Sequence, residues 1–220
     1  MKKILITGAG SGLGAELAKC YGEDKNHIIL VGRNKEKLAK ILNEIIQMGA
    51  TAEYVTCDIS NPKSVEELGK YISENHITID YLINNAGVGF FGPLGELTIS
   101  EMDTMINVNI KGTILVTQKL LPCINQKILN IISTAGLRGK ANETIYSASK
   151  FAVRGFTESL QKELADKDIK ITAVYMGGMD TPFWEDSTYV KDISKLKSPS
   201  EVAKEIKSKD DGRGEIIIGK

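Results

Sequence analysis

The amino-acid sequence predicts an α/β fold, in which a doubly wound parallel β-sheet carries helices on both faces. Short apolar runs alternate along the chain with longer segments whose apolar residues recur at helical spacing. Strands that alternate with helices form a parallel sheet, and right-handed crossovers place the helices on both of its faces. Ligands bind such sheets at the carboxyl ends of the strands. We therefore expect the loops after strands one to six to carry the function.

The first half of the chain contains four strands and three helices. The strands are predicted at residues 3–7, 28–31, 52–56 and 81–83. The first helix follows a glycine-rich turn and has an apolar stripe of Leu13, Leu17, Ala18 and Tyr21. The second has a stripe that stops at a glycine and consists of Leu38, Ile41, Leu42, Ile45 and Ile46. The third begins at Asn61-Pro62, with proline in its first turn, and runs to about Glu74.

The second half continues the alternation. A loop rich in Phe and Gly, residues 88–97, precedes a long helix over about residues 100–121 that stops near Pro122. Further strands are predicted at residues 128–132, 170–175 and 215–218. A helix that starts near Tyr146 is expected to turn four residues inward, Phe151, Phe156, Leu160 and Leu164. The last helix starts at Ser198-Pro199-Ser200-Glu201.

No repeat, low-complexity tract or linker interrupts the pattern. Residues 1–220 are therefore expected to form one domain, with a substrate loop at about residues 177–198 built into it. The chain is 42% hydrophobic, which suits one large core.

Charge and composition exclude several classes of function. Lys plus Arg and Asp plus Glu both count 28, so no basic excess points to nucleic acid or anionic lipid. Three scattered cysteines without a Cys-x-x-Cys argue against a disulfide framework or a zinc site, and two histidines argue against a histidine-built metal site. The N-terminal apolar run is too short for a signal peptide, and no segment approaches a membrane span. We expect a cytoplasmic protein without a metal.

The turn after the first strand predicts a nucleotide site. It reads Thr7-Gly8-Ala9-Gly10-Ser11-Gly12-Leu13-Gly14. Glycines permit a tight turn, and the backbone N–H groups at a helix start can face a pyrophosphate. The spacing is Gly-x-x-x-Gly-x-Gly rather than the commoner Gly-x-Gly-x-x-Gly. The alternative is an ordinary glycine-rich turn.

The loops after strands two and three refine this prediction. Strand two ends in Gly32-Arg33, where an NAD site usually has an acidic residue for the ribose 2′-OH. A guanidinium suits the 2′-phosphate of NADP, so Arg33 predicts NADP(H) over NAD(H). The alternative is a solvated arginine at a helix start. Asp58 could accept a hydrogen bond from the adenine amine, or it could cap the next helix.

Tyr146 and Lys150 form the candidate catalytic pair. In a helix, residues at i and i+4 lie one turn apart on one face, so the Lys150 ammonium would lie beside the Tyr146 phenol. This charge would lower the pKa of the phenol from about 10, and a tyrosine so tuned can exchange a proton with a substrate oxygen. The alternative is a tyrosine that packs at a helix end beside a solvated lysine.

Taken in order, these motifs resemble the short-chain dehydrogenase/reductase family over essentially the whole chain. Thr7-Gly8-x-x-x-Gly12-x-Gly14 is similar to the cofactor motif of the family, and Asn84-Asn85-Ala86-Gly87 to its motif after strand four. The other matches are the active-site asparagine, the catalytic serine, the Tyr-x-x-x-Lys pair and the threonine after strand six, which fall on Asn109, Ser133, Tyr146, Lys150 and Thr181.

The resemblance implies a single-domain Rossmann-like, NADP-dependent oxidoreductase that interconverts a carbonyl and a secondary alcohol. Tyr146 would exchange the proton, Ser133 would hold the substrate oxygen, and Asn109 would keep a water in line behind Lys150. Lys150 would both lower the pKa of Tyr146 and bind the nicotinamide ribose. The full set of implied cofactor contacts is Gly8, Ser11, Gly12, Leu13, Gly14, Arg33, Asp58, Ile59, Asn85, Ala86, Gly87, Tyr146, Lys150 and Thr181.

Other functions and assemblies follow from the same resemblance. The first alternative is a catalytically silent NADP-binding sensor or scaffold. An epimerase or dehydratase would need a larger substrate domain than this length supplies. The partner would be a small carbonyl or alcohol. Family members pair through the helices that hold Asn109 and Tyr146, so a homodimer or homotetramer is expected.

Two departures from the family pattern affect the loop after strand six. Met176 stands where the family usually has proline, so the loop would be less rigid and the placement of Thr181 less secure. The chain is also short after Thr181, which predicts a brief lid up to about Lys197 and an open pocket. Four aromatic residues either line that pocket or anchor its loops: Phe90, Phe91, Phe183 and Trp184.

Overall fold

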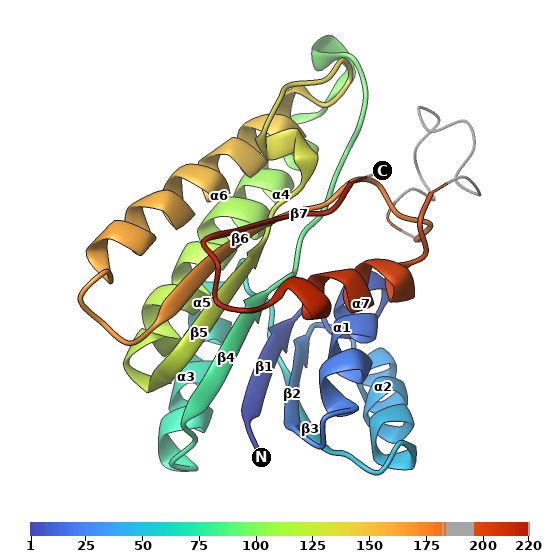
Figure 1. The fold of residues 1–220 in the computed structure, drawn as a ribbon. Helices are drawn as coiled ribbons and strands as arrows, with labels where there is room; N and C mark the ends of the chain where they lie inside the picture. The colour runs from blue at the N-terminus through green and yellow to red at the C-terminus, as the bar shows by residue number, and fades with distance from the viewer. Residues whose placement is uncertain (182, 184–195, 220) are drawn as a thin grey trace.

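Parallel strands form one twisted sheet through the middle of the molecule (Figure 1). The computed structural model describes residues 1–181, 183 and 196–219. Within that part of the chain the sheet has seven strands, all parallel, in the order β3-β2-β1-β4-β5-β6-β7. The strands are β1 Lys3–Thr7, β2 His27–Gly32, β3 Thr51–Thr56, β4 Ile79–Asn84, β5 Ile124–Ile131, β6 Lys170–Tyr175 and β7 Glu215–Ile217. The predicted doubly wound parallel sheet is confirmed.

Helices cover both faces of this sheet and bury its apolar side chains. One core contains residues of α1 Gly12–Gly22, α2 Lys35–Gln47 and α7 Pro199–Lys209. The core on the other face contains residues of α3 Pro62–Glu74, α5 Thr113–Leu120 and α6 Thr144–Glu163. Figure 1 shows α1, α2 and α7 together on one side of the strands. Because both faces are covered, the five inner strands are mostly buried runs, whereas the edge strands β3 and β7 are more exposed.

Local sequence signals set where several helices begin. The Asn34 side chain accepts a hydrogen bond from the Lys37 backbone N–H at 2.8 Å and so caps α2. Ser198 and Glu201 form a reciprocal capping box with Pro199 in the first turn of α7. The Asn61 side chain caps α3 by accepting a hydrogen bond from the Lys63 backbone N–H at 2.9 Å. The predicted starts of α3 and α7 are therefore confirmed.

The single long helix predicted for residues 100–121 is wrong in its middle. α4 Ile99–Met105 passes into a π-helical segment, η2 Ile106–Gly112, before α5 begins. The Asn109 backbone carbonyl accepts a hydrogen bond from the Thr113 hydroxyl at 2.9 Å. Its side chain is bound to a neighbouring loop at Val88. Short π segments are rare and often accompany functional sites.

Two side chains predicted to face inward are exposed. Phe151 is 42% exposed, although Phe156, Leu160 and Leu164 do pack on the core. At 100° per residue, nine residues separate Phe151 from Leu160 by half a turn, so both cannot face the same core. Ile46 is 51% exposed because it lies 100° from the buried Ile45.

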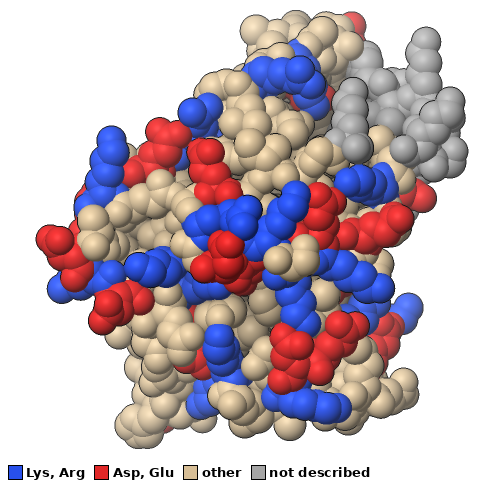
Figure 2. All heavy atoms as spheres, viewed as in Figure 1, with Lys and Arg blue, Asp and Glu red and all other residues tan. Residues whose placement is uncertain are grey.

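The surface carries both signs of charge. Figure 2 shows Lys and Arg interspersed with Asp and Glu over the face that carries α7. No helix in the described part of the chain combines the length and apolar character that crossing a bilayer requires. In residues 1–181, 183 and 196–219, no three His, Cys, Asp or Glu side chains come together in a way that could hold a metal ion.

Candidate active site

A cavity of about 490 Å³ lies at the carboxyl ends of the strands. It opens where the strand order reverses between β1 and β4, which is the expected ligand position in such a sheet. Loops after β1 to β6 all contribute to it. Of the predicted site residues, the cavity is lined by Gly8, Ser11, Gly12, Leu13, Gly14, Arg33, Asp58, Ile59, Asn85, Ala86, Gly87, Ser133, Tyr146, Lys150 and Thr181. Asn109 is the one predicted site residue that does not line it.

The glycines after β1 allow a close approach of three backbone segments. Gly8 has φ +67°, and a Cβ there would lie 2.8 Å from the Cα of Ala86. A Cβ on Gly14 would lie 2.3 Å from the Gly8 carbonyl oxygen. Larger residues at either position would push the first turn of α1 away from the strands. The glycine spacing therefore holds the helix start against the sheet.

Thr7 ties this turn to the loop after β4. Its hydroxyl oxygen accepts hydrogen bonds from the backbone N–H groups of Asn85 at 3.0 Å and Ala86 at 3.1 Å. The Asn85 side-chain amide donates to the Thr7 carbonyl at 3.0 Å. These bonds fix the two loops that border the reversal point of the sheet.

The start of α1 is suited to an anion. Ser11 occupies the N-cap position, but its side chain makes no capping hydrogen bond, and the first turn contains no acidic residue. First-turn N–H groups have no partner within a helix, and the helix dipole adds partial positive charge there. A phosphate in the cavity would satisfy these donors.

Two exposed cations border the cavity beyond β2. Arg33 follows the strand, and Lys37 lies in the first turn of α2. Lys37 is close to the glycine turn, because a Cβ added to Gly10 would lie 3.2 Å from the Lys37 Cβ. Neither pairs with an acidic side chain in the described ranges. The sequence reasoning missed Lys37, although its spacing of four residues from Arg33 was a usable signal.

Asp58 does not cap the following helix. Its carboxylate accepts hydrogen bonds from the Ser60 backbone N–H at 3.0 Å and the Ser60 hydroxyl at 2.7 Å, while Asn61 is the cap of α3. This local turn holds Asp58 at the edge of the cavity. Asp58 was predicted either to cap the next helix or to accept a hydrogen bond from the adenine amine. Only the second role fits this geometry.

Ser133 and Tyr146 meet in the interior end of the cavity. Ser133 follows β5, and its hydroxyl oxygen accepts a hydrogen bond from the Ala135 backbone N–H at 3.1 Å. The Ser133 hydroxyl lowers the pKa of the Tyr146 phenol, and both residues line the cavity. Tyr146 lies in the first turn of α6 and is 6% exposed. Both hydroxyl-bearing side chains therefore border the cavity, where a substrate oxygen could accept a hydrogen bond.

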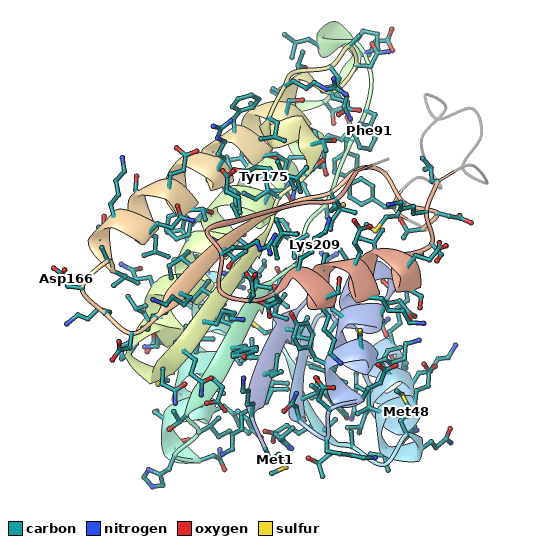
Figure 3. The ribbon with its side chains drawn as sticks, in the orientation of Figure 1. Met1, Met48, Phe91, Asp166, Tyr175 and Lys209 are labelled. Carbon is teal, nitrogen blue, oxygen red and sulfur yellow. The ribbon has the colours of Figure 1, made fainter. Side chains whose placement is uncertain are left out.

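Aromatic rings surround Tyr146. Its ring centroid lies 5.3 Å from that of Phe91 and 5.8 Å from that of Phe183, both in edge-on contact. Phe91 lies beyond the carboxyl ends of the strands, at the opposite end of the molecule from Met1 and Met48 (Figure 3). Phe183 lines the cavity, whereas Phe90 and Phe91 pack behind it. The predicted Trp184, with most of the lid, falls outside the described residues.

The expected lowering of the Tyr146 pKa is wrong for this structure. Burial raises the pKa of Tyr146 well above its usual value, outweighing the hydrogen bond from Ser133, and the Glu143 charge raises it further. The Lys150 ammonium lies 5.6 Å from the Tyr146 ring centroid. Burial also lowers the pKa of Lys150 to about 8. At the pH where the phenol would ionise, Lys150 is therefore already neutral and cannot stabilise a phenolate.

The burial of Lys150 predicts a pH-dependent stability. An unfolded lysine titrates near 10.4, so between about pH 8 and 10 the unfolded chain binds more protons than the folded one. The free energy of unfolding should therefore rise with pH in that window. A Lys150→Met variant should be more stable than the parent at pH 7 by on the order of 2 kcal/mol, and this difference should shrink towards pH 10.

Urea denaturation of both proteins across this range measures the effect. Lys63→Met, at an exposed position in α3, is the control and should show no such pH dependence. A Lys150→Met variant whose advantage is constant with pH would contradict the lowered pKa.

Asn109 connects the π-helical segment to the loop after β4 and to α6. Its side-chain carbonyl accepts a hydrogen bond from the Val88 backbone N–H, and its amide donates to the Val88 carbonyl, both at 2.8 Å. The amide also donates to the Ser149 hydroxyl at 3.0 Å. A Cβ on Gly87 would lie 3.3 Å from the Asn109 side-chain oxygen and 3.4 Å from the Lys150 Nζ. Asn109 thus lies close behind Lys150 without lining the cavity.

The segment after β6 closes the cavity despite the missing proline. The Met176 carbonyl accepts a hydrogen bond from the Thr134 backbone N–H at 2.9 Å, which ties this loop to the Ser133 turn. Thr181 lies opposite the glycine turn, with its Cγ2 3.6 Å from the position of a Cβ on Gly12. The backbone of Asp180 donates to the Lys197 carbonyl at 3.1 Å. Thr181 thus borders the cavity opposite the glycine turn, and the lower rigidity expected of the Met176 loop stays a prediction.

Comparison with known proteins identifies the family of this chain. A model of the short chain dehydrogenase family matches residues 2–191. The chain belongs to the short-chain dehydrogenase family. An uncharacterized oxidoreductase of Staphylococcus aureus strain USA300 is 37% identical over 184 residues, covering 82% of this chain and 79% of that protein. The recognition made from the sequence motifs is confirmed.

Solved structures give the same family. An alcohol dehydrogenase from the archaeon Thermococcus sibiricus, complexed with 5-hydroxy-NADP, is 28% identical with a TM-score of 0.90, covering 99% of this chain and 96% of that chain. A single-residue variant of actinorhodin polyketide ketoreductase, solved with NADPH, is 30% identical with a TM-score of 0.85, covering 94% and 89%. This short-chain dehydrogenase therefore belongs to a family of oxidoreductases and has the fold of that family.

Proposed function

We propose that this short-chain dehydrogenase is an NADPH-preferring carbonyl reductase, whose catalytic residues are Ser133, Tyr146 and Lys150, in one domain formed by residues 1–220. The observation that carries the proposal is that two groups of residues border one cavity. The first is a glycine turn with adjacent cations, and the second is the Ser133 and Tyr146 hydroxyls beside a buried lysine.

The residues present fit NADP(H). The glycines let the start of α1 pack closely against β1 and the loop after β4, and its first-turn residues border the cavity, which suits a pyrophosphate. Arg33 and Lys37 offer two positive charges at the far end of the same cavity, where a 2′-phosphate would need them. Relatives in fold were solved with 5-hydroxy-NADP and with NADPH. Asp58 and Ile59 would hold the adenine, and Asn85 to Gly87 would border the ribose beside Lys150.

The chemistry divides between cofactor and chain. NADPH, when bound, supplies a hydride from C4 of its nicotinamide to the carbonyl carbon. The Ser133 hydroxyl would donate a hydrogen bond to the substrate oxygen, and Tyr146 would donate its proton to the same oxygen. Because burial keeps the phenol protonated, Tyr146 is ready to act as the acid. Lys150 would hold the nicotinamide ribose, and Thr181 the carboxamide.

Asn109 would act behind Lys150. Its amide is fully engaged with Val88 and Ser149, which holds the π-helical segment against the loop after β4. We propose that Asn109 lets a water reach Lys150. This water and Lys150 would then replace the proton that Tyr146 loses.

Cofactor preference is the first test of this function. Replacing Arg33 with Ala should weaken NADPH binding by about tenfold to a hundredfold, because a charge-assisted hydrogen bond to a phosphate contributes roughly 1.5–3 kcal/mol. NADH binding should hardly change. Dissociation constants from titration of nicotinamide fluorescence measure both. Lys37→Ala should also weaken NADPH binding and leave NADH binding nearly unchanged, but the loss of NADPH affinity should be smaller than in Arg33→Ala.

Lys40→Ala provides the control, since Lys40 is exposed on the same helix but does not line the cavity. Equal affinities of the parent protein for NADPH and NADH would end the claim of NADP preference.

A screen of aldehydes, ketones and diketones, followed by NADPH absorbance, separates a reductase from a silent sensor, since a sensor would bind NADPH without consuming it.

A self-associating assembly is part of the proposal. Ile106, Ile114 and Phe151 are 46%, 36% and 42% exposed along the helices that hold Asn109 and Tyr146. A homodimer or homotetramer would cover them. Light scattering of the parent protein and of Phe151→Glu would test this, with a smaller mass expected for the variant.

A further inference from the structure

Three aromatic rings from distant segments meet beside the cavity. Phe91 belongs to the loop after β4, Tyr146 to α6 and Phe183 to the segment after β6. The ring centroids of Phe91 and Phe183 lie 5.7 Å apart, and they lie 5.3 Å and 5.8 Å from that of Tyr146. All three contacts are edge-on, which is a favourable geometry for aromatic pairs. The position of each ring therefore constrains the other two.

The three rings differ in how they meet the cavity. Tyr146 and Phe183 line it, whereas Phe91 packs behind them. Val88 also lines the cavity, and it packs with Phe183 against the buried cluster that contains Tyr146. Phe91 is therefore a support, while Phe183 and Val88 form an apolar wall of the cavity next to the phenol.

Gly89 leaves the space that two of these rings occupy. A Cβ at this position would lie 2.6 Å from the Cζ of Phe91 and 2.6 Å from the Cζ of Phe183, far closer than such atoms approach. The backbone of Gly89 does not adopt a positive φ, so alanine could take up its conformation. The missing side chain thus matters here for the packing of the rings rather than for a turn.

The charged residues just before α6 do not offer an open ion-pair partner to a substrate. Lys140 and Glu143 line the cavity, but their side chains pair with each other, with the Lys140 Nζ 3.6 Å from the Glu143 Oε1. A charged substituent on the substrate would have to separate this pair. The apolar wall and the paired charges together favour a neutral, apolar substituent.

We propose that Phe183 is a specificity-determining residue that selects carbonyl substrates with an aryl group next to the carbonyl, and that Gly89 sets the position of its ring. A substrate oxygen at the Tyr146 hydroxyl brings the neighbouring substituent close to Phe183, because the two rings are in contact. An aryl group buries more apolar area there than a small alkyl group and can add an aromatic contact. This inference rests on the proposed function, in which Tyr146 donates its proton to the substrate oxygen.

The ratio of kcat/KM for acetophenone to kcat/KM for butanone measures the selection for an aryl group. Phe183→Leu keeps an apolar side chain but removes the ring, so this ratio should fall about twofold to tenfold relative to the parent. Gly89→Ala should also lower the ratio, because the added Cβ displaces the ring without removing it. A merely structural role of Phe183 would reduce kcat/KM for both ketones equally and leave the ratio unchanged.

Phe156→Leu is the matched control. Phe156 lies in α6 and packs on the core between that helix and the sheet, and it does not line the cavity. The same substitution there should leave the ratio of the two ketones unchanged, even where thermal denaturation shows a loss of stability.

A second measurement needs no turnover. Benzamide resembles acetophenone in shape but is not reduced by NADPH, and acetamide is the corresponding small analogue. Their binding to the complex with NADPH can be followed by titration of nicotinamide fluorescence. Phe183→Leu should weaken benzamide binding about twofold to tenfold and hardly change acetamide binding.

The outcomes distinguish failure of the inference from failure of the proposed function. A lower ratio in Phe183→Leu and Gly89→Ala, with none in Phe156→Leu, supports the inference. Tyr146-dependent turnover with an unchanged ratio, or a parent enzyme that reduces butanone but not acetophenone, would overturn it and leave the proposed function standing. If no carbonyl is reduced, the proposed function fails. Benzamide binding that depends on Phe183 would then still support an aryl subsite, and binding that does not would overturn it.

Discussion

Replacing Tyr146 with Phe is expected to lower kcat by about 10²- to 10⁴-fold, the range that a positioned general acid contributes. The substitution removes one oxygen and leaves the ring, so the contacts with Phe91 and Phe183 should persist. NADPH affinity should therefore change little. NADPH absorbance in the presence of an active carbonyl gives kcat, and fluorescence titration gives the dissociation constant.

Tyr175→Phe is the matched control. Tyr175 is fully buried in β6, and among the described residues its hydroxyl has no hydrogen-bond partner. Removing that oxygen should leave kcat unchanged and keep or slightly raise stability, because an unpaired buried hydroxyl is unfavourable. A Tyr146→Phe enzyme that keeps a near-parental rate would refute the proposed acid.

Replacing Gly14 with Ala is expected to abolish measurable NADPH binding at concentrations that saturate the parent. The added Cβ would lie 2.3 Å from the Gly8 carbonyl oxygen and 2.5 Å from the Asn85 side-chain nitrogen. Since the first contact is with backbone, the start of α1 must move away from β1, and the donors that would face a pyrophosphate move with it. Fluorescence titration measures the binding, and thermal denaturation measures the accompanying loss of stability.

Gly155→Ala tests whether the effect belongs to the position rather than to the substitution. Gly155 lies within α6, and a Cβ there would meet nothing within 4 Å. Alanine should therefore stabilise the helix by roughly 0.5–1 kcal/mol and leave NADPH binding intact. Parental NADPH affinity in Gly14→Ala would contradict the role given to the glycine turn.

Much of the fold could be read from local patterns. The strands β1 and β6 and the helix α3 have the predicted bounds, because an apolar run, a cap and a proline are signals within a few residues. The continuous helix over residues 100–121 was wrong, because a π-helical segment depends on the contact between Asn109 and Val88 across the fold. Phe151 was misplaced because its exposure depends on which face of α6 meets the sheet.

The candidate site shows the same division. Arg33 and the glycine turn were predicted from their place after a strand, and both line the cavity. Lys37 was missed although it lies four residues after Arg33, because only the fold shows that both residues border the same cavity. The hydrogen bond between the Met176 loop and Thr134 joins segments far apart in the sequence, so no local pattern predicts it.

The sequence alone determined the family, the order of the loops around the cavity, and the residue types that each loop presents, because parallel strands bring their carboxyl ends to one edge of the sheet. Only the tertiary structure decided the protonation of Tyr146 and Lys150. Their spacing of four residues suggested an ammonium that favours phenolate, but burial disfavours charge on both groups, and rings from distant segments, Phe91 and Phe183, pack on Tyr146. A pKa depends on everything packed around a group, and sequence spacing supplies one neighbour of many.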